Sequence, residues 1–252
     1  MKSIAKGLIA AICFFTKLPL WRLYSPEKEY YKRVVNYWPY AGIVTGGVAA
    51  AVMAGAAFVF PPSVAVILAI AARLLLTGAL HEDGLADFAD GFGGGTDRQR
   101  ILAIMKDSHI GSYGVITLAI YFLLLYTLLA SVPVKSAAVM IFCADICGKF
   151  IAGNIVNMLP YAREEAQSKN KLVYERMPLG VWLCNLVFVA TVLVFFNFYF
   201  PQLSLIKAFV APVILFLLAA FYIKKKLGGY TGDCCGALFL MCELSYLLII
   251  VS

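Results

Sequence analysis

Apolar runs long enough to cross a lipid bilayer constrain this chain more than any other feature. They lie at about 40–60, 64–80, 112–132, 136–157, 180–200, 205–223 and 234–251, and a helical crossing needs about 20 apolar residues. The chain is 62% hydrophobic and 14% charged, whereas a soluble domain is about 45–50% apolar and about 25% charged. The sequence therefore predicts an all-α, polytopic integral membrane bundle of about seven transmembrane helices.

The N-terminal apolar run is too short to cross. Residues Ile4 to Phe15 follow a basic start, as in a secretory signal peptide, but no small-residue cleavage site comes after them. We expect a short interfacial or re-entrant helix here. No repeat, low-complexity tract or linker divides the chain, so we expect a single integral membrane catalytic domain over residues 1–252.

The basic residues predict how the helices are oriented. The net charge is +7, but Lys and Arg stand between the apolar runs, which is a topology signal and argues against a nucleic-acid partner. If the N-terminus is inside, nearly all of the 21 basic residues fall on the inside, and only Lys135 and Lys207 fall outside. The inside loops are also the long, polar ones. We therefore expect the chemistry on the cytoplasmic side.

A cluster of acids lies between the second and third apolar runs, in HEDGLADFADG. If the second helix continues through it, Asp83, Asp87 and Asp90 stand at i, i+4 and i+7 on one stripe, and His81 points away. Carboxylates on one stripe near a membrane repel one another, so a cation is expected to compensate. Oxygen ligands suit Mg²⁺, Mn²⁺ or Ca²⁺. The alternative is an acidic helix end in water.

The segment after the acids carries groups that suit phosphate. Arg98 and Arg100 follow a run of three glycines, a pattern that binds phosphate through backbone N–H groups and guanidinium forks but also occurs in ordinary loops. Lys106, Asp107 and Ser108 come just before the third run. We expect Lys106 to contact phosphate and Asp107 to be a further ligand.

A second polar junction precedes the last apolar run. It contains Gly228, Gly229, Thr231 and Asp233, on the same predicted face as the acid cluster, which suggests a two-sided site. The alternative is a flexible turn with Asp233 as the helix N-cap.

Charged residues within the apolar runs leave a different class of function open. Asp145 and Lys149 stand at i, i+4 and are expected to pair, and Arg73 is expected to snorkel to the interface rather than to neutralise the acids. With Glu243, these charges are compatible with a cation transporter. Against transport, the richest polar sequence lies at cytoplasmic junctions, and no paired broken helices are evident.

Four blocks of the sequence resemble a known family. They are TKLPL, YWPYAGIVTGG, TGALHEDGLADFADGFGGGTDRQRILAIMKDSHIGSYGV and GGYTGDCCGALFLMCEL, and in this order they resemble the cobalamin 5'-phosphate synthases, or adenosylcobinamide-GDP ribazoletransferases. The resemblance implies a Mg²⁺-dependent transferase in the bacterial inner membrane. Its reaction joins adenosylcobinamide-GDP to α-ribazole or its 5'-phosphate with release of GMP, late in the nucleotide-loop assembly of cobalamin biosynthesis.

The resemblance also implies roles for individual residues. Asp83, Asp87 and Asp90 become metal or diphosphate ligands, Asp107 and Asp233 ligands or nucleophile-orienting carboxylates, and Lys106 a phosphate contact. The general base, the preferred form of ribazole and the oligomeric state stay open. Substrate contacts are expected from His81, Arg98, Arg100, Ser108, Gly228, Gly229 and Thr231.

A second enzyme family shares part of the acid block. Residues Asp83 to Ala86 fit the start of the DGxxAR pattern of CDP-alcohol phosphotransferases, but Asp87 stands where that pattern has Arg. A CDP-alcohol phosphotransferase-like enzyme of lipid synthesis is therefore the alternative, and the KDS and GGxTGD blocks favour the corrinoid enzyme.

Overall fold

A computed structural model describes residues 3–163 and 172–252, and within these ranges the chain is helical without any strand. The first half contains α1 (Ser3–Phe15), η1 (Leu20–Arg22), α2 (Lys28–Tyr31), η2 (Val34–Tyr37), α3 (Trp38–Ala56), α4 (Pro62–Thr77), α5 (Leu80–Gly94), α6 (Arg98–Ile104) and α7 (Ser112–Ala130). The second half contains α8 (Val134–Gly153), α9 (Ile155–Met158), α10 (Leu179–Tyr199), η4 (Pro201–Leu203), α11 (Leu205–Ala208), α12 (Val210–Leu227) and α13 (Gly232–Val251).

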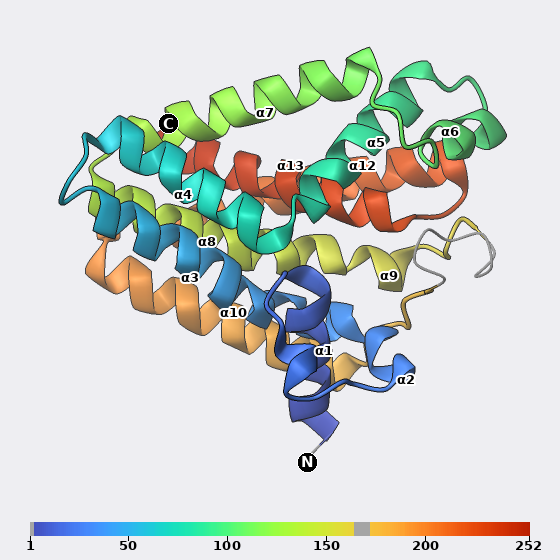
Figure 1. Cartoon of the computed structure of the whole chain (residues 1–252), viewed down its shortest axis with the longest axis horizontal. Helices are drawn as coiled ribbons and strands as arrows, with labels where there is room; N and C mark the ends of the chain where they lie inside the picture. Colours follow the sequence, from blue (N-terminus) through green and yellow to red (C-terminus); the bar gives the residue numbers. More distant parts are fainter. Residues whose placement is uncertain (1–2, 164–171) are drawn as a thin grey trace.

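The prediction of an all-α, polytopic membrane bundle is confirmed. In the described chain six helical segments are long and apolar enough to cross a membrane, and the bent pair α4 and α5 gives up to seven. The long helices lie side by side in Figure 1, while α1 runs across them at a steep angle. With 13 residues, α1 is too short to cross.

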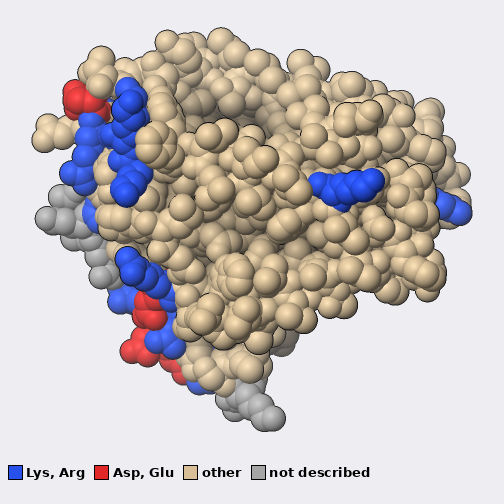
Figure 2. All heavy atoms as spheres, turned by 180° about the vertical axis from the view of Figure 1, so that it is seen from behind, with Lys and Arg blue, Asp and Glu red and all other residues tan. Residues whose placement is uncertain are grey.

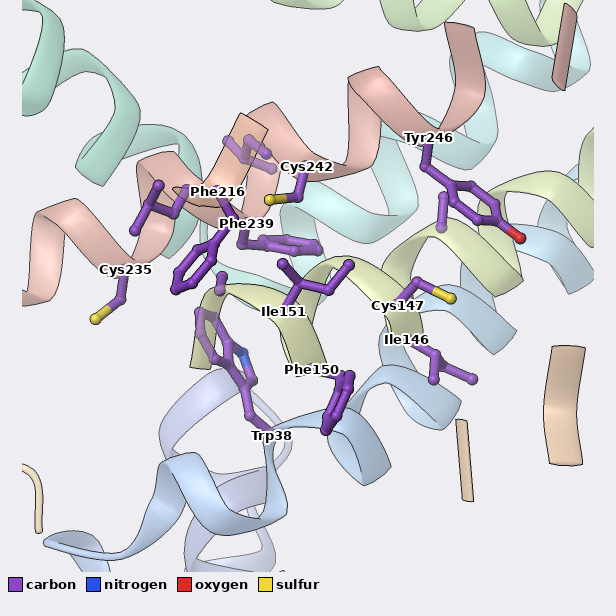
Figure 3. Packing of buried hydrophobic residues seen from close by; sticks show 14 of the residues in the cluster. Trp38, Ile146, Cys147, Phe150, Ile151, Phe216, Cys235, Phe239, Cys242 and Tyr246 are labelled. Atoms are coloured by element: carbon purple, nitrogen blue, oxygen red, sulfur yellow. The ribbon is translucent and has the colours of Figure 1, made fainter. Parts of the chain in front are cut away.

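Helix α8 occupies the centre of the bundle. In its span, Val134–Met158, 89% of the most apolar window is buried, against 17% for α10. Gly42 and Gly46 let α3 approach closely: a Cβ atom on either would stand 3.0 Å from a side-chain atom of α8. Small residues are the usual means of close helix contact in membranes. On the other side of α8, Phe239 of α13 packs against Gly148, within the buried cluster of Figure 3.

Charges gather at one end of the molecule. Figure 2 shows Lys and Arg side chains concentrated at one end of the visible face, with two isolated basic patches on the otherwise uncharged remainder. Loops at the charged end include the segments before α6 and after α12, where Lys224, Lys225 and Lys226 end the helix. This distribution is the one expected from the positive-inside rule.

A buried ion pair joins the second and last spans. Arg73 of α4 is 2% exposed, and its guanidinium forms a bidentate pair with the carboxylate of Glu243 on α13. Tyr121 of α7 donates its hydroxyl to Glu243 at 2.7 Å and accepts from Arg73 at 2.8 Å. The prediction that Arg73 snorkels to the interface is therefore wrong, because a buried carboxylate satisfies the guanidinium inside the bundle.

The expected pairing of Asp145 with Lys149 is confirmed and extends the same network. Both side chains are buried and form an ion pair within α8. Thr45 of α3 donates to Asp145 at 2.8 Å, and the second Asp145 oxygen lies 3.8 Å from Arg73. Lys149 also lies 4.5 Å from the centre of the Phe239 ring, a cation–π distance. Opposite charges balance within this buried network, so each ion has a partner away from water.

Candidate active site

A sharp break separates the second span from the acidic helix. α4 ends at Thr77, both Gly78 (φ 65°) and Ala79 (φ 55°) adopt left-handed conformations, and α5 leaves at 89° to α4. The second helix therefore does not continue through the acids, and Asp83, Asp87 and Asp90 lie together on the separate helix α5. Lys17 explains part of the break: its backbone N–H bonds to Leu76 O at 2.7 Å, and its side chain lies where any Cβ on Gly78 would stand. The TKLPL segment thus fixes the bend.

Two glycines allow the acidic helix to meet the start of α13. A Cβ on Gly84 would lie 3.0 Å from the carbonyl oxygen of Asp233, and a Cβ on Gly236 would lie 3.1 Å from the carbonyl oxygen of His81. Both obstacles are backbone atoms, so a larger residue would force the helices apart. The two polar junctions of the sequence therefore come together in space, as expected for a two-sided site.

A pocket opens where these helices meet α1 and α3. Its accessible space is about 140 Å³. Charged side chains on its wall are Asp83, Arg163 and Asp233, and the rest of the wall is mostly aromatic or apolar. The lining is Phe14, Phe15, Val35, Trp38, Leu80, His81, Asp83, Tyr161, Arg163, Leu172, Tyr174, Gly232, Asp233, Cys235 and Gly236.

The three acids of the stripe face different surroundings. Asp83 is exposed and lines the pocket, and Asp87 is half-buried. Asp90 is buried, and its two oxygens accept hydrogen bonds from the backbone N–H groups of Gly111 at 2.7 Å and Gly114 at 2.9 Å. Asp90 thus holds the first turn of α7, where free N–H groups favour a carboxylate. Its role as a metal ligand stays a prediction.

The pocket offers carboxylates to a cation from two helices. Asp83 comes from α5 and Asp233 from α13, and across the described residues no three His, Cys, Asp or Glu side chains form a group that could hold a metal ion. Mg²⁺ in nucleotide-handling proteins is commonly held by one or two carboxylates together with substrate phosphates and water. The donor set present here fits that arrangement.

The second junction packs against the segment that follows α9. Gly228 has a left-handed backbone (φ 68°) that ends α12, and Gly229 lies against Pro160 and Ala162 too closely for a Cβ. Thr231 is the N-cap of α13 and accepts from Cys234 N at 3.4 Å. The alternative of Asp233 as N-cap is therefore wrong, because Asp233 stands in the first turn and lines the pocket.

The phosphate-binding candidates of the central block lie mostly outside this pocket. Arg98 donates to the carbonyl of Ala162 at 2.8 Å, which braces the segment beside the pocket. Lys106 and Ser108 are exposed. A second cavity, of about 430 Å³, is lined by Asp90, Gly94, Arg100, Ala103, Ile104, Asp107, His109, Gly111, Ser112 and Tyr113.

Asp107 in this second cavity bonds locally. Its carboxylate accepts from the backbone N–H of His109 at 3.0 Å and lies 2.7 Å from Nδ1 of the same residue. These hydrogen bonds lower the pKa of Asp107 below its usual value. Its carboxylate is therefore ionised at neutral pH.

Several residues of the pocket were not predicted from the sequence. Phe15 and Trp38 stack with ring centres 5.1 Å apart, and Tyr174 and Arg163 come from the segment between α9 and α10. The only sequence signals for these residues were the TKLPL block beside Phe15 and the YWPY block around Trp38.

Comparison with known proteins agrees with the four motif blocks. The sequence pattern of a family described as cobalamin-5-phosphate synthase matches residues 7–251. An adenosylcobinamide-GDP ribazoletransferase of Shewanella amazonensis is 36% identical, covering 96% of this chain and 94% of its own length. One from Clostridium botulinum strain Langeland is 32% identical, covering 100% and 99%, and one from a Polaromonas species is 34% identical, covering 98% and 97%. No solved structure matches. On this full-length match, the chain belongs to the cobalamin-5-phosphate synthase family.

Proposed function

We propose that this chain is a Mg²⁺-dependent membrane transferase that joins adenosylcobinamide-GDP to α-ribazole or its 5'-phosphate and releases GMP. The full-length similarity to proteins named adenosylcobinamide-GDP ribazoletransferase supports the reaction. The observation that carries it in the structure is the pocket between α5 and α13, where carboxylates and an arginine lie beside an aromatic wall. Its carboxylates, Asp83 and Asp233, come from two of the blocks that carry the family resemblance.

The proposed reaction is a phosphoryl transfer. The ribazole hydroxyl oxygen forms a bond to the phosphorus that bears cobinamide, the bond from that phosphorus to the bridging oxygen breaks, and GMP leaves with the electron pair. A bound Mg²⁺ would neutralise charge on the diphosphate oxygens. Asp83 and Asp233 would hold it, and an oxygen of one of these two carboxylates that is not bound to the metal would take the hydroxyl proton.

Groups of the chain other than the carboxylates complete the pocket. Arg163 presents a guanidinium, a group suited to phosphate oxygens, and its Nε is buried without a partner among the described residues. The first turn of α13 also faces the pocket at Gly232, and a helix N-terminus favours an anion. The aromatic wall would exclude water from the reacting groups.

The proposed location is the cytoplasmic side of the bacterial inner membrane, with the substrates and the lipid bilayer as partners. Asp83 and Asp233 lie at the junctions that the positive-inside pattern assigns to the cytoplasm. A soluble nucleotide-activated substrate would reach them from that side.

The test is GMP release by the purified chain in lipid nanodiscs. Adenosylcobinamide-GDP, α-ribazole phosphate and Mg²⁺ should give GMP and the joined corrinoid in equal amounts, and EDTA should stop the reaction until Mg²⁺ is restored. CDP-diacylglycerol with an alcohol serves as the comparison. Release of CMP from that pair, without GMP release from the corrinoid pair, would replace the proposal with the CDP-alcohol phosphotransferase reaction.

A further inference from the structure

His81 carries a buried polar atom without a partner at the wall of the pocket. The side chain is 3% exposed, it lines the pocket, and its Nε2 has no hydrogen-bond partner among the described residues. Leaving such an atom unsatisfied inside a protein is unfavourable. Buried polar groups of this kind in a native pocket commonly await a ligand or a water.

Aromatic rings fix the plane of the His81 imidazole. Phe15 and Trp38 stack with it at ring-centre distances of 6.1 and 5.8 Å, and Phe239 meets it edge-on at 4.8 Å. These rings come from α1, α3 and α13, so three separate elements hold one imidazole. Such a flat aromatic wall suits a flat heteroaromatic ring.

Beyond the charged groups, the rest of this wall combines apolar side chains with the two tyrosines Tyr161 and Tyr174. Phe14, Val35, Leu80 and Leu172 complete the apolar part of the lining, whereas the carboxylates and Arg163 are assigned to the diphosphate and its metal in the proposed function. A base that fits must therefore be largely apolar and need few hydrogen bonds. Each additional donor on it would need a tyrosine hydroxyl as its acceptor, because a donor buried without an acceptor is unfavourable.

The two bases in the proposed reaction, guanine and dimethylbenzimidazole, differ in how many hydrogen-bond partners they need. Guanine carries a ring N–H and an amino group that both need acceptors. The dimethylbenzimidazole of α-ribazole has two apolar methyl groups and one ring nitrogen that is free to accept a hydrogen bond. One nitrogen of His81 is enough for the second base and too little for the first.

We infer that the aromatic part of this pocket is the subsite for the benzimidazole base of the acceptor, and that His81 donates a hydrogen bond to the free ring nitrogen of that base. The inference rests on the proposed function and names the part of the substrate that this wall recognises. It makes His81 a specificity-determining residue. The donor's guanine must then bind elsewhere.

The test is a double-mutant cycle in which one change is made in the ligand and the other in the protein, with the equilibrium binding affinity as the readout. The affinity of the full-length protein in detergent for α-ribazole phosphate is measured by calorimetry, together with that for an analogue in which CH replaces the free ring nitrogen. The wild-type protein should bind the analogue roughly 5- to 150-fold more weakly, the range for one buried hydrogen bond left unmade. His81→Phe should bind both ligands with nearly equal affinity, and His81→Gln, which keeps a donor, should recover part of the preference.

Each outcome separates the inference from the proposed function. Equal affinity of the wild-type protein for both ligands, with GMP release intact, would overturn the subsite and leave the transferase standing. A preference that persists unchanged in His81→Phe and in His81→Gln would do the same. If His81→Phe weakened GDP or GMP binding but not acceptor binding, the pocket would belong to guanine. Absence of both acceptor binding and GMP release in the wild-type protein would remove the proposed function itself.

Discussion

The buried pair of Arg73 and Glu243 gives the sharpest prediction about stability. Glu243→Gln removes one negative charge from a network of two cations and two anions. Among the described residues the guanidinium of Arg73 is then left with a neutral amide oxygen in place of the carboxylate, with the Tyr121 hydroxyl and with Asp145 at 3.8 Å. Breaking a buried ion pair on one side costs about 3–5 kcal/mol, a roughly 150- to 5,000-fold change in the folding equilibrium. Arg73→Met should lose a similar amount.

Removing both partners should restore much of that loss. In Arg73→Met with Glu243→Met, charge balance returns, because Asp145 and Lys149 still pair. The Tyr121 hydroxyl, however, loses both the partner it donates to and the one it accepts from. A remaining deficit of about 1–3 kcal/mol is expected from that buried group, and adding Tyr121→Phe should reduce it.

The assay is reversible unfolding of the detergent-solubilised protein by a denaturing detergent, followed by far-UV circular dichroism. A matched control is Glu27→Gln, which breaks the exposed pair with Lys6 and should leave the unfolding midpoint almost unchanged. If both single variants stayed within about 1 kcal/mol of the wild type, or if the double variant lost the sum of the two single losses, the reasoning on buried charge balance would be refuted.

Three further predictions follow from other contacts. Gly84→Ala and Gly236→Ala should each lower turnover and stability, because the added Cβ meets backbone atoms at 3.0–3.1 Å. The control Gly180→Ala on α10 has open space around the added Cβ and should be neutral or slightly stabilising. Equal melting temperatures for all three variants would contradict the close approach of α5 and α13. Asp90→Asn should speed amide exchange at Gly111 and Gly114, measured by hydrogen exchange with mass spectrometry, since an amide side chain is a weaker partner for two N–H groups than a carboxylate; unchanged exchange would argue against the cap. The pKa of Glu27 is lowered from 4.5 to about 2 by its hydrogen bond from Lys6. The stabilisation from this pair should therefore be complete above about pH 4.5 and disappear as the pH falls toward 2. Protection of the amides of residues 27–31 against hydrogen exchange that does not depend on pH across this window would contradict the prediction.

Local patterns in the sequence predicted the membrane spans and the two polar junctions that meet at the pocket. Apolar length located the crossings, and the two glycine-rich junctions were placed on one face by the positive-inside count. Their meeting at Asp83 and Asp233 followed from topology. The i, i+4 spacing of Asp145 and Lys149 was enough to predict their pairing.

Features that depend on distant contacts were beyond such patterns. Ala79 is an ordinary helix former, so its left-handed conformation shows only when Lys17 is seen packed at the break. The partner of Arg73 lies 170 residues away, and the burial of Arg73 inside the bundle, at 2% exposure, is what makes pairing preferable to snorkelling. The backbone N–H groups that bond to the Asp90 carboxylate belong to Gly111 and Gly114, which lie 21 and 24 residues further along the chain.

We assign the chemistry to the pocket where α5 meets α13. The decisive measurement is the rate of GMP release by Asp83→Asn and Asp233→Asn, compared with that of Glu29→Gln, which changes an exposed acid on α2. All three proteins should insert and melt like the wild type. Asp83→Asn and Asp233→Asn should each lose turnover by at least about 100-fold, the scale for removing a group that stabilises the transition state, while Glu29→Gln should keep wild-type turnover. Near-normal turnover in both Asp83→Asn and Asp233→Asn would contradict the assignment of this pocket as the active site.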